Sequence, residues 1–589
     1  MVVFLDLMCT FASDFKKMGT ESLKVKRMKR ILLIAAFAAL AYTGRAEGLP
    51  TIEITTTTAL NAREKVEARM KTDGYDGPIG IKLRGNSSLG FNQKKYTIET
   101  RDADGKDLDV SLLGLPAHSK WVLLAPYNDV SMIRDPLAFQ LWRDMGHWGP
   151  RTVMCEVTVD GEYRGIYIFS EAIKRGTERV NISKLKKSDV SGRDVTGGYL
   201  LRIDTFDEND ATFTSKVPGI GEGNMSSQVI WSCIYPKKKN MQPEQMAYIQ
   251  NYVDTVEQVI QSEDFADPDR GYARYIDVPS FVDYFIHTEL SLNADGYKRS
   301  AYFYKEKQRA DGTGGKLFAG PVWDYNLAYG NCNFANANNL EAWCFEGASN
   351  NPTPAMWQRL LQDPNFRRAV KQRYQQLRKG ALSIDSINAY IDRHARLVDK
   401  AKDHHFQTYP ELLVSEERKQ QLAEQKKNNP QGGFPFGGFP MGGGFPGGGG
   451  FPMGGPPMGG GGFPTAGPPM GGGSFPMGGP PMGGDGFPPA GPPMGGGGFP
   501  MGGFPMGGGG FPQGGGFPGG GQFMFDGAGM FSAYRVSSYE EEIGVLKQWI
   551  ADRLAFLDQN IERFDKDWQP RIQPLVEKKM EFGLPYQFP

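Results

Sequence analysis

The chain has little cysteine, no net charge and no long apolar segment. Its 589 residues include five Cys, four of them after residue 46, which is too few for a fold built on disulfides. The 66 Lys and Arg balance the 66 Asp and Glu, and no sustained basic run follows residue 46. Phosphate binding along a nucleic acid needs clustered cations, so this balance argues against a nucleic-acid-binding protein.

Charge is almost absent between residues 431 and 522, where Asp485 is the one ionisable side chain. This stretch instead holds 43 of the 77 Gly and 20 of the 41 Pro, in short repeats rich in Phe and Met. It lacks the strict three-residue glycine period of collagen, and glycine entropy opposes a packed core. We expect a disordered insertion, either a passive spacer or a source of weak contacts to a surface or matrix.

The N-terminus resembles an export signal. A basic stretch, Lys24–Arg30, precedes the apolar run Ile31–Tyr42, and small residues end at Ala46. The 12-residue run is shorter than the roughly 20 residues of a membrane-spanning helix, and no other stretch approaches a span. We therefore expect residues 1–46 to be an extended leader and signal peptide, and the protein to be secreted, periplasmic or on the cell surface. Export permits a Cys332–Cys344 disulfide, and two thiols are an equal alternative.

Hydrophobic periodicity predicts strands first and helices later. From residue 50 to 204 apolar and polar residues alternate in short runs, which predicts strands at 51–56, 79–84, 95–99 and 156–169. One helix, Ser131–Met145, interrupts them. Further helices are predicted at 246–262, 278–292, 365–377 and 384–401. This order indicates an α+β fold, with two lobes and a cleft as one arrangement of it.

An amphipathic helix follows the glycine-rich stretch. Apolar residues recur every three or four positions from Ile543 to Phe564, which would leave an apolar stripe in water unless the helix packs on the preceding domain. Loop closure costs grow only logarithmically with length, so a long insertion permits that packing. We expect a domain at 47–430, the insertion at 431–522 and a packed helix with a tail at 523–589.

Four polar clusters beside glycines are candidates for chemistry. The turn Arg84–Phe91, followed by Lys94 and Lys95, combines backbone N–H groups, hydroxyls and cations that suit phosphate oxygens. Glu171 ends an apolar strand, where it either caps the strand or directs a lysine. Asp295 lies at a helix-to-strand junction and Asp324 follows a short apolar strand; alone, each could be a turn residue. Together they suit a base and a metal ligand for phosphoryl transfer.

Six motifs in order resemble the landmarks of the spore coat protein H (CotH) kinase family. They are Arg84–Ser88, Asn128–Arg134, Gly161–Tyr167, Gly197–Tyr199, Asn293–Tyr297 and Gly320–Tyr325. The resemblance runs from about residue 50 to 400 and resumes at 540–565. It implies an atypical secreted or surface-layer protein kinase with a diverged two-lobed kinase fold. Such an enzyme would use ATP and Mg²⁺ to phosphorylate Ser or Thr on a partner protein and on itself.

The resemblance also implies roles for individual residues. Asp295 would be the catalytic base, Lys94 the phosphate-binding lysine with Glu171 as its ion-pair partner, and Asp324 the metal ligand. Ser300 stands where family members often have an Asn for a second metal ion, and a hydroxyl is a poorer ligand. The residues implied for nucleotide contact are Arg84, Asn86, Ser87, Glu171 and Arg134.

Two other classes of protein remain open at this point. A pseudokinase or adhesive surface protein would keep the fold without catalysis, and it fits Ser300 and the scarcity of ATP outside the cytoplasm. A hydrolase with two carboxylates would use Asp295 and Asp324 but would leave the Arg84 turn and Lys94 without a role. The sequence names neither the phosphorylated partner nor the oligomeric state.

Overall fold

The computed structural model describes residues 48–220, 228–332, 335–347, 353–415 and 536–565, with the single residues 417, 420 and 424. The chain divides into two compact units, Met1–Gln425 with Gln522–Pro589, and Lys426–Gly521. All described residues belong to the first unit. The predicted leader at 1–46 and the predicted insertion at 431–522 lie outside them.

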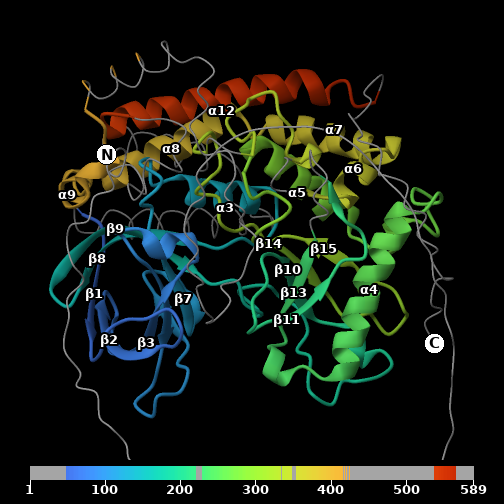
Figure 1. The fold of residues 1–589 in the computed structure, drawn as a ribbon, viewed down its shortest axis with the longest axis horizontal. Coiled ribbons are helices and arrows are strands. Elements are labelled where there is room, and N and C mark those ends of the chain that lie inside the picture. Colours follow the sequence, from blue (N-terminus) through green and yellow to red (C-terminus); the bar gives the residue numbers. More distant parts are fainter. Residues whose placement is uncertain are drawn as a thin grey trace, which may run out of the picture. The chain divides into compact units, whose positions relative to one another are not determined.

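A closed barrel of seven strands forms the N-terminal part of the first unit (Figure 1). Its order is β1-β2-β3-β4-β7-β9-β8, closed by the parallel pair β1–β8. Alternate side chains such as Ile52, Ile54, Ile79, Ile81 and Ile98 are buried in its core, as strand geometry requires. The strands are β1 (Thr51–Thr56), β2 (Val66–Thr72), β3 (Tyr75–Arg84), β4 (Lys95–Thr100), β7 (Lys120–Leu124), β8 (Thr152–Val159) and β9 (Glu162–Glu171).

A second, five-stranded sheet has the order β11-β13-β10-β14-β15. Its strands are β10 (Tyr199–Ile203), β11 (Ala211–Thr214), β13 (Ile230–Tyr235), β14 (Ala301–Lys305) and β15 (Leu317–Ala319). Two short pairs, β5 (Val110–Leu112) with β6 (Leu115–His118) and β12 (Gly219–Ile220) with β16 (Thr353–Pro354), complete the described strands.

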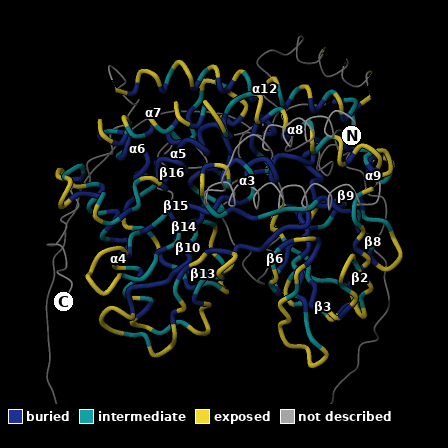
Figure 2. The backbone as a smooth tube through the Cα atoms, turned by 180° about the vertical axis from the view of Figure 1, so that it is seen from behind, coloured by how far each residue is buried: buried dark blue, intermediate teal, exposed yellow. Residues whose placement is uncertain are grey.

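Helices pack beside the second sheet and share one large core with it. Helix α5 contacts β15 and α7, and α12 contacts α5, α7 and α8, so these helices lie side by side (Figure 1). Every residue of α5 from Ser280 to Ser291 is buried (Figure 2). The helices are α3 (Arg134–Asp144), α4 (Pro243–Gln261), α5 (Val278–Ser291), α6 (Met356–Leu360), α7 (Pro364–Arg378), α8 (Ile384–Val398), α9 (Lys402–Thr408) and α12 (Tyr539–Ile561).

The structure confirms the mixed α+β class, with strands early and helices late. The predicted strands correspond to β1, β3, β4 and the β8–β9 hairpin, and the predicted helices to α3, α4, α5, α7, α8 and α12. Helix α3 begins at Arg134, three residues later than predicted, because Met132 has φ 59 and interrupts the right-handed helix. No helix in the described ranges is both long and apolar enough to cross a membrane. Cys332 and Cys344 are thiols, so the disulfide alternative is not the one the structure shows.

Candidate active site

Two loops carry the aspartates that the sequence singled out. Asp295 lies between α5 and β14, and Asp324 follows β15 by five residues. Asn293 connects the two loops, since its Nδ2 donates to the Asp324 carbonyl (3.3 Å) and its Oδ1 accepts from the Asp295 backbone N–H (3.2 Å). One side-chain amide therefore fixes the backbone at both aspartates.

The same two loops hold several residues in the left-handed region. Leu292 (φ 44), Tyr297 (φ 67) and Ser300 (φ 47) surround Asp295, and Asp324 (φ 66) and Tyr329 (φ 50) lie in the second loop. A non-glycine residue there costs on the order of 1 kcal/mol or more, and such strain gathers at functional sites. The surrounding packing therefore imposes these conformations on both loops.

Lys95, the first residue of β4, extends from the barrel to the second loop. Its Nζ lies 3.8 Å from Asp324 Oδ1, and the residue is 8 % exposed. The Nζ of the neighbouring Lys94 instead donates to the Leu89 carbonyl at 2.7 Å, within the turn that precedes it. Successive strand side chains point to opposite faces, so only one of two adjacent lysines reaches the aspartate. The structure places Lys95 there, where the sequence favoured Lys94.

The turn Arg84–Phe91 leads into this lysine pair and contains the 3₁₀ helix η1 (Ser87–Gly90). The Arg84 guanidinium lies 5.2 Å from the ring centroid of Trp323, which directly precedes Asp324. Asn86 and Ser87 are exposed at the tip of the turn. Gly85 has φ +124, and a Cβ there would lie 1.9 Å from Ser88 Oγ, so the turn requires glycine.

Carboxyl groups near Asp324 have raised pKa values. Burial raises the pKa of Asp295 to about 6; the charge of Arg299 lowers it and that of Asp324 raises it. Burial also raises the pKa of Asp135 to about 7, with the Asp324 charge as the next cause and Lys95 opposing it. Asp204 shows the same direction for its pKa, chiefly through burial. Mutual repulsion around Asp324 is what a bound cation would relieve.

The carboxylates fit a hard cation that is shared with phosphate oxygens. No group of three or more His, Cys, Asp or Glu side chains able to hold a metal ion occurs in the described ranges. Mg²⁺ usually takes only one or two carboxylates and completes its shell with phosphates and water, so Asp324 with a neighbouring carboxylate is a sufficient donor set. Ser300, at the start of the segment that enters β14, supplies a hydroxyl in the Asp295 loop.

Glu171 has other partners than the expected lysine. Its Oε1 lies 2.8 Å from Arg151 Nη2 and 3.4 Å from Arg179 Nε, and its Oε2 accepts from the Arg151 backbone N–H at 2.9 Å. The residue is fully buried at the end of β9. Two arginines thus neutralise Glu171 within the barrel wall, and it does not aim Lys94 at a phosphate.

Arg134 is likewise a structural residue and not a nucleotide contact. It is 0 % exposed, and its Nη1 lies 2.5 Å from Asp129 Oδ1 and 2.6 Å from Glu542 Oε1. Its position in the Asn128–Arg134 motif gave no sign of this, because Glu542 is 408 residues away in the sequence.

The sequence assigned no role to three residues near this site: Asn293, Asp135 and Asp204. Lys95 belongs to the predicted cationic cluster, but the role of phosphate-binding lysine was assigned to Lys94. Asn293 lies inside a family motif, so its polar character was a usable signal. Asp135 Oδ1 accepts from the Tyr325 backbone N–H at 2.6 Å and thereby fixes the residue after Asp324. Its place in the first turn of α3 made it indistinguishable from an ordinary helix-start carboxylate.

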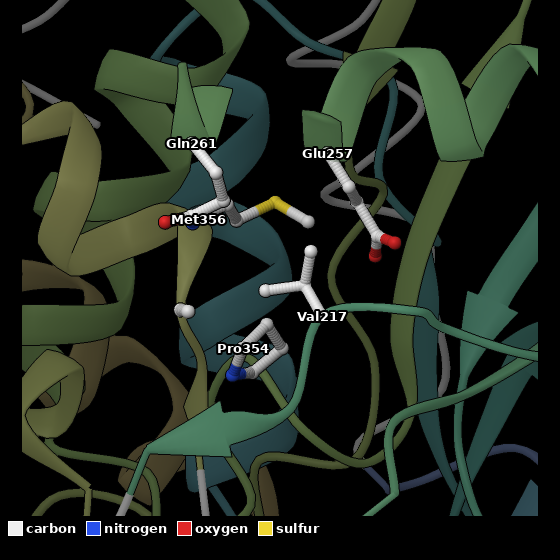
Figure 3. A pocket seen from close by; sticks show the side chains of 6 residues that line it. Val217, Glu257, Gln261, Pro354 and Met356 are labelled. Carbon is white, nitrogen blue, oxygen red and sulfur yellow. The ribbon is translucent and has the colours of Figure 1, made fainter. Parts of the chain in front are cut away.

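A small pocket elsewhere in the unit shares no residue with these loops. It is lined by residues of α4, β16 and α6 together with Val217 (Figure 3). Glu257 in its wall accepts hydrogen bonds from Ser215 Oγ (2.7 Å) and Trp231 Nε1 (3.0 Å). Each oxygen of this carboxylate therefore has a donor from the protein itself.

Comparison with known proteins gives a family match that spans both aspartate loops. No match was found among curated proteins. A family model described as CotH kinase protein matches residues 81–429, more than half of the chain, and it includes the Arg84 turn, Lys95, Asp295 and Asp324. The chain belongs to the CotH kinase protein family.

Proposed function

We propose that this protein is an atypical secreted kinase that transfers the γ-phosphoryl group of ATP to Ser or Thr hydroxyls of a surface or coat protein and of itself. The observation that supports the proposal is that Lys95 Nζ of the barrel lies 3.8 Å from Asp324 Oδ1, in a loop that Asn293 ties to the backbone at Asp295. Family membership supports kinase chemistry in general.

Asp295 is the proposed catalytic residue. A bond forms between the acceptor oxygen and the γ-phosphorus, the bond from that phosphorus to the β,γ-bridging oxygen breaks, and ADP leaves. The hydroxyl proton passes to the Asp295 carboxylate. A base works best when its pKa lies near the working pH, and burial has moved the pKa of Asp295 to about 6.

The remaining charged groups bind and orient the phosphates. Asp324, with Ser300 from the Asp295 loop, would hold Mg²⁺, which neutralises developing phosphate charge when it is bound. Lys95 and Arg84 supply positive charge on the barrel side, and the exposed turn with Asn86 and Ser87 offers N–H and hydroxyl donors. Lys94 stays a secondary candidate, because its Nζ already donates to Leu89.

Location and architecture complete the proposal. The basic and apolar segments before Ala46 support export by a signal peptide, and the Gly/Phe/Pro/Met stretch at 431–522 supports surface or matrix contacts. The barrel and the helical part with its five-stranded sheet would correspond to the two lobes of a diverged kinase fold, with the nucleotide between them.

Purified protein with Mg²⁺ and γ-labelled ATP tests this function. The parent is expected to label itself on Ser or Thr, and Asp295→Ala and Asp324→Ala should each lower the transfer rate by roughly 10³-fold. Asp269→Ala changes an exposed aspartate between α4 and α5. It is the matched control and should transfer at the parental rate. The proposal is contradicted if the parent transfers no label, or if both site variants transfer label at the parental rate.

Ser300 favours one second candidate, a pseudokinase that binds nucleotide without catalysis. A hydroxyl in place of the amide oxygen weakens a second metal site. Under this alternative ATP and Mg²⁺ raise the thermal midpoint of unfolding, whereas no label is transferred. Ser300→Asn then distinguishes the two, because added transfer would show a kinase limited only by its metal ligand.

A further inference from the structure

Helix α12 follows the glycine-rich stretch in the sequence, yet two of its charged residues are deeply buried. Glu542 is 2 % exposed and Arg553 is 0 % exposed. A helix that only covers a core buries apolar residues, and a buried charge is tolerated only when it is paired and hydrogen-bonded. These two residues therefore have specific partners, and the partners lead to the two aspartate loops.

Glu542 acts on the Asp324 loop through one arginine. Its Oε1 accepts from Arg134 Nη1 at 2.6 Å. The same guanidinium donates from Nε to the Ala328 carbonyl (3.1 Å) and from Nη2 to the Tyr329 carbonyl (3.4 Å). Both carbonyls belong to the loop that follows Asp324. Glu542 on α12 shares the arginine with Asp129, whose Oδ1 lies 2.5 Å from the same Nη1, and the arginine in turn holds the loop.

Arg553 acts on the Asp295 loop. Its Nε and Nη2 donate to the Glu289 carbonyl at 2.9 and 2.8 Å, and its Nη2 lies 3.6 Å from Glu289 Oε2. Glu289 belongs to the last turn of α5, and its Oε1 accepts from the Tyr297 hydroxyl at 2.9 Å. Tyr297 is two residues after Asp295, so this chain of contacts spans the loop from both ends.

A close approach between α12 and the Asp324 loop adds a third, independent contact. Gly330 has φ +76, and a Cβ at this position would lie 2.5 Å from Trp549 Cδ1. The ring of Trp549 also packs edge-on against Tyr329, at 6.2 Å between centroids. The helix therefore meets the loop at van der Waals distance as well as through buried charge.

We propose that α12 is a positioning element of the active site, in which Glu542 holds the Asp324 loop and Arg553 holds the Asp295 loop. The inference rests on the proposed function, because it assigns the chemistry to those loops. It means that residues on both sides of the stretch 431–522 are needed for one catalytic centre. Glu542 and Arg553 touch no substrate and act through Arg134 and Glu289.

Hydrogen exchange on the full chain without nucleotide tests separately whether Glu542 holds the Asp324 loop and whether Arg553 holds the Asp295 loop. Glu542→Gln keeps the shape but removes the charge, and it should speed amide exchange by about tenfold at 325–331 while 293–297 keep the parental rate. Arg553→Lys should show the reverse pattern. Glu540→Gln is the matched control, since it removes an acid of the same helix whose side chain is 68 % exposed. Uniformly faster exchange across the unit would mean general loosening and would overturn the proposal.

Phosphoryl-transfer kinetics on the same variants test whether these two contacts affect substrate binding and the transfer rate. Glu542→Gln is expected to raise the KM for Mg-ATP by about tenfold with kcat within twofold, and Arg553→Lys to lower kcat by about tenfold with KM within twofold. A general loss of folded protein would lower kcat alone in both. If the parent transfers label and both variants match it, only the positioning role is overturned. A parent without transfer overturns the proposed function and the positioning role with it.

Discussion

The barrel and the helical part are stabilised by different means. Barrel side chains such as Ile54, Ile81 and Ile98 alternate into an apolar core, and each strand pairs with a neighbour through backbone hydrogen bonds. Both regions also hold buried ion pairs, but Glu171 of the barrel pairs with Arg151, only 20 residues away. The helical part pairs Arg134 with Glu542 and Arg553 with Glu289, which are 408 and 264 residues apart. Local pattern thus builds the first region, and long-range charge pairing positions the second.

The largest stability difference between the regions should come from removing one buried charge. Arg134→Met leaves Asp129 and Glu542 without their cation, and we expect the free energy of unfolding to fall by about 3–5 kcal/mol. Ile98→Val, which removes one methylene from the barrel core, should lower it by only about 1 kcal/mol. Urea unfolding of the full chain, followed by circular dichroism, measures both.

The control for that comparison neutralises Asp129 and Glu542, the two acids that lose their cation. Adding Asp129→Asn and Glu542→Gln to Arg134→Met should recover part of the lost stability, because the cost arises from unpaired buried charge and not from lost volume. If Arg134→Met unfolds at the same urea concentration as Ile98→Val, the ion pair does not stabilise the helical part and the contrast between the regions fails.

The next effect concerns the place where the two regions meet. Lys95→Met removes the barrel cation that lies beside Asp324, and kcat/KM for ATP should fall by about 100-fold, the usual loss for a charged group that binds a phosphate oxygen. Lys94→Met is the matched control from the adjacent position and should stay within about threefold, because its Nζ serves the Leu89 carbonyl. A larger loss of kcat/KM in Lys94→Met than in Lys95→Met would mean that Lys94, and not Lys95, binds the phosphate.

The sequence predicts the strands and helices of the fold better than the side-chain contacts of the site. Alternation in 51–56 and 79–84 predicts strands because the period of two is local. The choice between Lys94 and Lys95 depends on where β4 begins, and a shift of one residue reverses which side chain faces the second loop.

Ion pairs between residues far apart in the sequence are the second reason why the sequence did not predict the contacts of the site. Arg134 closes the Asn128–Arg134 motif and Glu171 ends the strand that follows the Gly161–Tyr167 motif. The resemblance implies nucleotide contact for both and a lysine partner for Glu171. Their actual partners, Arg151 for one and Glu542 for the other, are fixed only when distant segments pack. A charge inside a motif therefore predicts a polar environment, but one sequence does not reveal whether that environment is substrate or protein.

The smallest effect we expect is a pH-dependent stability difference at Asp295, in the helical part. Its pKa is about 6 in the folded chain against a reference of 3.8, so between these values the folded state keeps a proton that the unfolded state has lost. Stability from this group is therefore present at low pH and is lost as pH rises through 6. Asp295→Asn removes the penalty and should raise the free energy of unfolding by about 2–3 kcal/mol at about pH 8, with no difference near about pH 3. Urea unfolding at both pH values checks this, with Asp269→Asn as an exposed control that shows no such trend. A variant equally stable with the parent at both pH values would mean that Asp295 ionises freely in the folded chain, so that burial in the helical part does not destabilise its ionised carboxylate.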